Sequence, residues 1–196
     1  MSPTYLYCLT APDAPDPPTA TVGLDGGVVR RLGDAWVSDV DSRSVRATIE
    51  RIRSHDSVVA SALGTGSTPL PARFGQTFES DEACLAELSA KRARMSAGLA
   101  RVAGMVEMTV ILRVDLDTSS GTAYLQSLAR RQHVARDVSA RLGDCIRQSA
   151  EKTRDDALTL SHLVDREAVP EYRKRLEGLD ARILGPGAPY SFAPPE

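Results

Sequence analysis

The chain has 196 residues, of which 42% are hydrophobic and 26% are charged, a composition typical of a globular protein that buries a core. Its formal net charge is −2 and only 5% of its residues are aromatic, so neither a cationic field nor a base-stacking surface favours nucleic acid as a partner. No stretch approaches the roughly 20 apolar residues of a membrane-spanning helix, and we expect no membrane partner.

The three cysteines, Cys8, Cys84 and Cys145, are widely spaced, odd in number and without metal-binding spacing. The N-terminal sequence MSPTYLYCLT has neither the basic region nor the long apolar run of a targeting segment. We therefore expect reduced thiols in a cytoplasmic protein.

The first third of the chain predicts a small β-meander. Residues 5–9 (YLYCL) are β-prone and are followed by a proline-rich loop. Further strands are expected at residues 28–32, after a Gly-Gly turn, and at residues 35–40.

An amphipathic helix should follow, capped by Asp41 or Ser42 and ending near Gly64, because apolar residues from position 45 to position 63 recur at helical spacing. His55 and Asp56 lie on or beside its buried face. We interpret them as a structural hydrogen-bonding pair, since no nucleophile or metal ligand accompanies them; a general-base dyad is the alternative.

Residues 69–78, PLPARFGQTF, cannot form a helix, because Pro69 and Pro71 remove backbone donors and favour extended geometry before them. We predict an extended connector or edge strand between two helices. Gly75 allows a bend. Arg73 stands between apolar neighbours, and we expect a carboxylate or carbonyl partner that pins the segment.

Ser80 should cap a helix whose apolar positions continue to Val102 and pack on a sheet or a partner helix. Residues 105–115 (MVEMTVILRVD) alternate apolar and polar side chains, which indicates a strand with one face in the core. We expect Glu107 and Arg113 to be surface or edge residues of that strand.

The second half predicts a strand, a long helix, a strand, a helix and a strand. The long helix opens at residues 119–121, its apolar face runs to Ser149, and Asp155-Asp156 end it. Residues 157–164 and 181–184 read as strands on either side of a helix that begins near Pro170.

These elements predict an α+β fold of two small domains, each a β-sheet with helices packed on one face. We expect an N-terminal domain of residues 1–104 and a C-terminal, ferredoxin-like domain of residues 105–196 with an extended tail, GPGAPYSF.

Motifs that would indicate catalysis or cofactor binding are absent: the sequence has no P-loop, dinucleotide fingerprint, zinc-protease helix, C-x-x-C pair or nucleophile elbow. Its three histidines are scattered without acids or cysteines at ligand spacing. We predict no catalytic residue, no cofactor and no metal.

Three separated segments together resemble the GvpL/GvpF family of gas vesicle proteins over essentially the whole chain. They are YLYCL, the block HDSVVASALGTGSTPLPARFGQTF with the helix and strand after it, and the tail GPGAPYSF. Gly187 and Ala188 depart from the usual tail, and Cys8 stands where the family commonly has glycine.

The resemblance implies a non-enzymatic accessory or minor structural protein of gas vesicles, the gas-filled cytoplasmic shells that provide buoyancy. It implies binding to the hydrophobic shell protein GvpA and to other gas vesicle accessory proteins, and help in shell nucleation and assembly. A small-molecule-binding regulatory α+β module is the alternative, which a deep apolar pocket with convergent polar groups would favour. A hydrolase that uses His55 and Asp56 is the remaining possibility.

Seven residues carry the resemblance and are candidates either for fold maintenance or for partner contact: Pro71, Arg73, Phe74, Gly75, Pro189, Tyr190 and Phe192. We favour fold maintenance, by two rigid extended segments docked on the domain cores.

Overall fold

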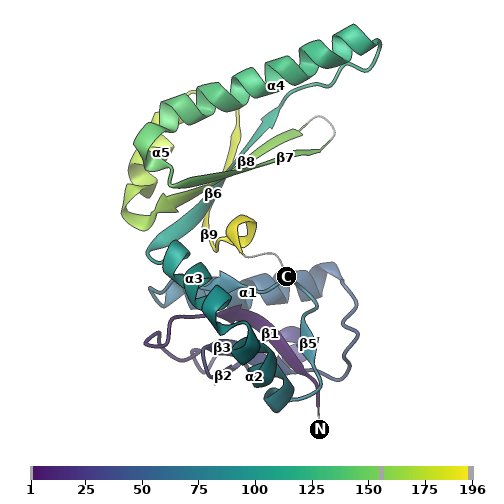
Figure 1. The fold of residues 1–196 in the computed structure, drawn as a ribbon, viewed down its shortest axis with the longest axis vertical. Helices are drawn as coiled ribbons and strands as arrows, with labels where there is room; N and C mark the ends of the chain where they lie inside the picture. The colour runs from purple at the N-terminus through teal and green to yellow at the C-terminus, as the bar shows by residue number, and fades with distance from the viewer. Residues whose placement is uncertain (1, 155–156, 194–196) are drawn as a thin grey trace. The chain divides into compact units, whose positions relative to one another are not determined.

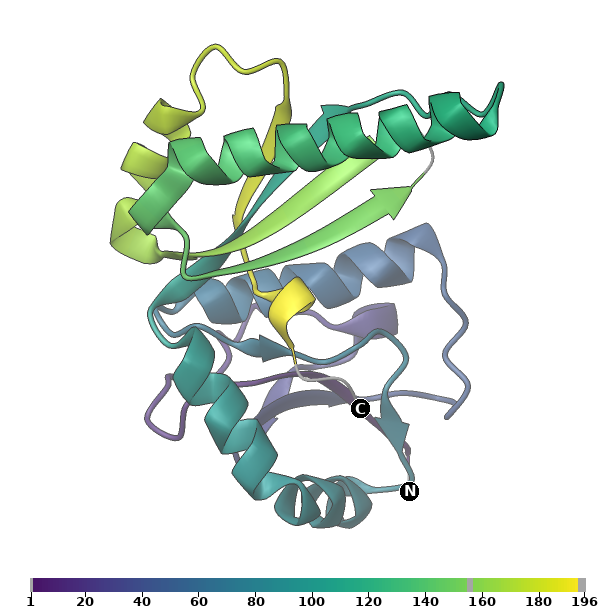
Figure 2. The same ribbon diagram turned by 45° about the horizontal axis from the view of Figure 1, so that its top comes forward.

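The computed structural model describes residues 2–154 and 157–193 (Figures 1 and 2). The chain forms two compact units: the first comprises residues 1–104 and 188–196, and the second comprises residues 105–187. The sequence predicts the whole tail in the second domain. In the structure residues 185–187 stay in the second unit, whereas the tail from Ala188 on joins the first unit, because Ala188 belongs to that unit's hydrophobic core.

The first unit contains a five-stranded antiparallel sheet in the order β2-β3-β1-β4, with β5 also paired to β1. Its strands are β1 (Thr4–Leu9), β2 (Arg30–Leu32), β3 (Ala35–Asp39), β4 (Leu70–Pro71) and β5 (Thr77–Phe78). Its α-helices are α1 (Ile49–Gly64), α2 (Asp81–Ala90) and α3 (Arg92–Val102).

Helices lie on both faces of this first sheet. Tyr5 and Tyr7 of β1 contact His55 of α1, whereas Leu6 and Leu9 face residues of α2 and α3. Successive residues of a strand point to opposite faces, and the bulge in β1 between Leu6 and Cys8 adjusts this alternation. The expectation of helices on one face therefore does not describe the first unit.

The second unit contains a four-stranded antiparallel sheet in the order β7-β8-β6-β9. Its strands are β6 (Met105–Arg113), β7 (Gln148–Arg154), β8 (Ala157–Asp165) and β9 (Arg182–Gly187), and its α-helices are α4 (Gly121–Leu142) and α5 (Val169–Arg175). The chain order β-α-β-β-α-β is the one that the term ferredoxin-like denotes. Both helices contribute to one core with β6 and β8, on one face of the sheet (Figure 2).

The expected alternation in β6 is confirmed, because Val106, Met108, Val110 and Leu112 are buried and the residues between them are half-buried. Ser80 and Ser120 cap α2 and α4, each accepting a hydrogen bond from the amide three residues on. The Ser80 cap was predicted from the sequence, and α4 begins within the expected residues 119–121.

The bounds of three expected helices differ from the structure. Helix α1 begins at Ile49 with Thr48 as its cap, so the earlier apolar Val45 packs on the core from outside the helix. The expected helix 80–102 is interrupted at Lys91. The long helix ends at Leu142, and residues 148–154 form strand β7; Asp155 and Asp156, the expected helix end, lie outside the described residues.

Candidate functional site

Residues 69–78, which we call the strap, form the edge of the first sheet. Leu70 and Pro71 pair with Leu9 and Cys8, and Thr77 pairs with Tyr5, so both short strands of the strap run antiparallel to β1. Residues 72–76 stand opposite only Leu6 and Tyr7 of β1, and they therefore bulge out of the sheet. This confirms the prediction of an edge strand between two helices.

A short hydrogen-bond chain holds the bulge. Gly75, at φ 90°, donates its N–H to the hydroxyl of Tyr5 at 3.0 Å, and that hydroxyl lies 2.9 Å from His55 Nδ1. Because the Tyr5 oxygen already accepts from Gly75, we infer that its proton goes to Nδ1, which makes His55 a neutral Nε2–H tautomer. Burial lowers the pKa of His55 and raises that of Tyr5, in agreement with this assignment.

The strap and the tail meet at His55. The imidazole ring centroid lies 5.9 Å from that of Phe74 in the strap and 6.4 Å from that of Tyr190 in the tail. Burial and the hydrogen-bonded carboxylate of Asp56 raise the pKa of Tyr190. His55 and Asp56 thus bond to other elements, which supports their interpretation as structural residues.

The tail is also held from α3. Phe192 is buried, and its carbonyl oxygen accepts a hydrogen bond from the guanidinium of Arg101. Residues Tyr190–Phe192 form a short 3-10 turn after the buried Pro189. The two segments that carry the family resemblance are therefore parts of one aromatic junction, although more than 100 residues of sequence separate them.

We expect Tyr5→Phe to destabilise the first unit by about 1–3 kcal/mol, because it leaves the Gly75 N–H and His55 Nδ1 without their shared partner. The unfolding midpoint in urea, followed by the fluorescence of the sole tryptophan, Trp36 in the first unit, would measure this loss. A midpoint equal to that of the unmodified protein would show that the hydrogen-bond chain contributes nothing.

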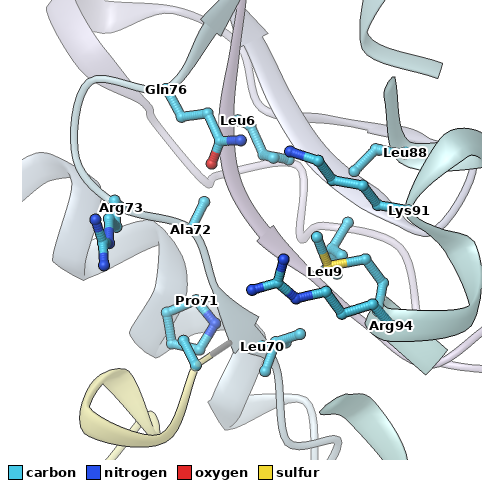
Figure 3. A pocket seen from close by; sticks show the side chains of 12 residues that line it. Leu6, Leu9, Leu70, Pro71, Ala72, Arg73, Gln76, Leu88, Lys91 and Arg94 are labelled. Atoms are coloured by element: carbon cyan, nitrogen blue, oxygen red, sulfur yellow. The ribbon is translucent and has the colours of Figure 1, made fainter. Parts of the chain in front are cut away.

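Beside the strap lies an apolar cavity of about 60 Å³ between the sheet and helices α2 and α3 (Figure 3). We call it the leucine groove, and its apolar lining is Leu6, Leu9, Leu70, Pro71, Leu88 and Met95. A neighbouring cavity of about 280 Å³ shares Leu9, Leu88 and Met95 with it. Helix α3 therefore leaves part of the apolar sheet face unfilled.

Cationic side chains stand at the border of the leucine groove and of the neighbouring cavity. Figure 3 shows Lys91 and Arg94 reaching over it from the helices, and Arg73 on the strap extending away from them. Lys91 pairs with Glu87 at 2.7 Å. Arg73, Arg92 and Arg94 are exposed, and among residues 2–154 and 157–193 none of the three has an ion pair or a hydrogen bond.

The expectation that Arg73 pins the strap is therefore wrong. The side chain stands at the top of the bulge, where it reaches solvent and needs no buried counter-charge. The strap is held by backbone pairing instead, including Ala72 N–H to the Tyr7 oxygen at 2.9 Å and Leu6 N–H to the Gln76 oxygen at 3.0 Å.

The candidate residues divide by burial. Pro71, Pro189 and Phe192 are buried, and Phe74 and Gly75 are half-buried within the aromatic junction. Arg73 is exposed and Tyr190 is 40% exposed. Only these last two of the seven offer a substantial side-chain surface to another molecule.

The family model described as "Gas vesicle synthesis protein GvpL/GvpF" matches residues 3–194. The chain belongs to the GvpL/GvpF family. A curated relative, "Gas vesicle protein L" from Streptomyces sp. (strain CB03234), is 25% identical in an alignment that is 245 residues long. The match covers 96% of this chain and 92% of the relative. The resemblance drawn from the three sequence segments is confirmed.

Solved structures confirm the α+β fold of this GvpL/GvpF protein. The crystal structure of GvpF from Anabaena sp. PCC7120 matches with a TM-score of 0.86 at 22% identity, covering 100% of this chain and 98% of that one. GvpF from Microcystis aeruginosa matches with a TM-score of 0.81 at 18% identity, covering 99% and 100%.

The described part of this GvpL/GvpF protein has no group of three or more His, Cys, Asp or Glu residues that could hold a metal ion. Within the same residues, no helix is long and apolar enough to cross a membrane. All three cysteines are buried free thiols, and burial raises the pKa of Cys84 to about 11, so its thiol is protonated at neutral pH.

Sequence reasoning missed the leucine groove as a site. The expected helix from Ser80 to Val102 was predicted to pack its apolar side chains, which include Leu85, Leu88, Met95 and Leu99, on a sheet or a partner helix. Sequence reasoning could not show that this packing is incomplete, because a void depends on how far apart two elements lie and not on which residues they carry.

Proposed function

We propose that this protein binds the hydrophobic gas vesicle shell protein GvpA and assists gas vesicle nucleation and assembly in the cytoplasm without catalysing a reaction. Membership of the GvpL/GvpF family supports a role in gas vesicles. The observation that carries the binding role is the leucine groove with its neighbouring cavity, where apolar side chains leave space unfilled and the exposed guanidinium groups of Arg73, Arg92 and Arg94 stand at the border.

A shell subunit with exposed apolar surface or free strand edges aggregates before it is incorporated. Leu88 and Met95 at the leucine groove and Leu85 at the neighbouring cavity offer accessible apolar side chains that would cover such a surface. The exposed Arg73, Arg92 and Arg94 would bond carboxylates or carbonyl oxygens at the border. An amphipathic helix of the partner would satisfy both requirements.

Arg73→Ala combined with Arg94→Ala tests the proposal in a pull-down with purified GvpA. We expect at least a tenfold loss of retention, about 1.4 kcal/mol, with an unchanged melting temperature, because neither side chain has a partner within the described residues. Arg53→Ala, an exposed arginine on α1, is the matched control and should retain GvpA normally.

Failure of the unmodified protein to retain GvpA would refute the proposed function itself. Normal retention by the double variant would refute only the assignment to the leucine groove. A large drop in melting temperature would instead return Arg73 to the fold-maintaining role favoured by the sequence analysis.

A further inference from the structure

A second hollow lies entirely within the second unit, between α4 and the β7–β8 hairpin. It is a groove of about 610 Å³, within the range of small-molecule sites. Its polar lining comes from three elements: Gln132, Arg136 and Ser139 of α4, Ser149 and Glu151 of β7, and His162 of β8. Leu160 and Ala135 add an apolar floor.

These polar side chains converge for geometric reasons. Ser149 pairs with His162 and Glu151 pairs with Leu160 across the β7–β8 ladder, so these four residues share the sheet face that α4 covers. Residues 132, 136 and 139 follow helical spacing along one side of α4. Arg136 donates Nε to the Gln132 carbonyl at 3.3 Å, which leaves both terminal nitrogens of its guanidinium available.

His162 is the feature that points to a ligand. It is 1% exposed, and its Nδ1 lies 2.7 Å from the hydroxyl of Tyr172, which is itself fully buried. Among the described residues this histidine is the hydroxyl's hydrogen-bond partner, so the hydroxyl must donate to Nδ1 to satisfy its own proton. We infer that the imidazole then carries its proton on Nε2, which leaves this N–H as the donor that His162, a lining residue, can offer to a molecule in the groove.

The charges select the chemical class. The Nε2–H of His162, the guanidinium of Arg136 and the hydroxyls of Ser139 and Ser149 are donors suited to a carboxylate. Glu151 is the one anionic group among these lining residues, and it disfavours a bare anion but accepts from a hydroxyl or ammonium group. We propose that this groove binds a small organic carboxylate that also carries a hydrogen-bond donor, such as a hydroxy acid.

This site is independent of the proposed binding of GvpA, and its test uses different probes. Mandelate, a hydroxy acid with an apolar ring for the Leu160 floor, is titrated into the full-length protein while the His162 ring nitrogens are followed by long-range ¹H–¹⁵N NMR. Phenylacetate lacks only the hydroxyl, and inorganic phosphate is a bare anion. We expect saturable shifts at His162 with mandelate, a Kd of about 1 mM, and binding several-fold weaker with phenylacetate.

Arg136→Gln should weaken mandelate binding at least tenfold, whereas Arg141→Gln, an exposed arginine further along α4, should leave it unchanged. Both variants keep their melting temperatures if the side chains act only on the ligand. No His162 shift with mandelate, equal affinity in Arg136→Gln, or phosphate binding as tight as mandelate would each overturn the proposal.

Discussion

Gly185→Ala is expected to destabilise the second unit by about 3–5 kcal/mol. Gly185 has φ 103°, a conformation that alanine adopts only with strain. A Cβ atom there would lie 2.6 Å from the carbonyl oxygen of Glu107 and 3.1 Å from Met108 Sδ. The carbonyl belongs to β6, which is paired on both sides, so it cannot move away without breaking the sheet.

Gly178→Ala is the matched control for this prediction. Gly178 also has a positive φ, 78°, but no heavy atom lies within 4 Å of the position of its Cβ. The Gly178→Ala substitution should therefore lower the stability of the second unit only by the backbone strain, about 1–2 kcal/mol. Far-UV circular dichroism in urea would compare the two variants, and equal losses would show that the close approach to Glu107 relaxes freely. The glycine of the GP pair in the tail would then need another explanation.

The second large effect is a loss of stability as the pH falls from about 6.5 to about 4. Burial lowers the pKa of His162 to about 4, whereas a histidine in an unfolded chain titrates near 6.5. Between these values the unfolded state binds the extra proton, so acid favours unfolding. The loss from His162 is about 2 kcal/mol at pH 5 and approaches 3 kcal/mol near pH 4.

His55 acts in the same direction in the first unit, since burial lowers its pKa too. The carboxylates with lowered pKa, including Asp81 and Asp144, lose their contribution only as the pH falls below their usual range near 4. The interval from pH 6.5 to 4.5 therefore isolates the two buried histidines.

Urea unfolding at several pH values would measure this dependence, with hydrogen exchange of β8 amides reporting on the second unit. His162→Gln should flatten the profile of the second unit, even though the variant starts from a lower stability. A parallel profile in His162→Gln would mean that His162 is not the titrating group.

The sequence correctly predicted those elements in which apolar, buried side chains recur with the period of a strand or of a helix. Strand β6 has one buried face, so its alternation was clear. The strap was identified through its prolines, which exclude a helix whatever surrounds it. The apolar face of α4 was correct from Leu128 to Leu142, where the helix ends and Gly143 follows with a positive φ, but Tyr124 and Leu125 at its start are exposed.

The misses have physical causes. Strand β7, QSAEKTR, is a sheet edge, and its polar residues from Gln148 to Thr153 are exposed. It therefore lacks the alternation of a strand, and only pairing with β8 makes it one. The break at Lys91 has neither glycine nor proline to mark it. The leucine groove and the contact of Phe74 and Tyr190 with His55 depend on distances between elements far apart in sequence, which composition and spacing do not encode.

The return of residues 188–192 to the first unit also affects synthesis on the ribosome. The first 104 residues emerge early, but their core lacks Ala188, and α3 lacks the Phe192 carbonyl that Arg101 binds, until residues 188–192 have been translated. Domains usually fold in the order in which they are translated. Here the N-terminal unit has to wait through translation of the whole second unit, and a nascent chain stalled near residue 187 would present its strap and α1 without the closing aromatic side chains of the tail.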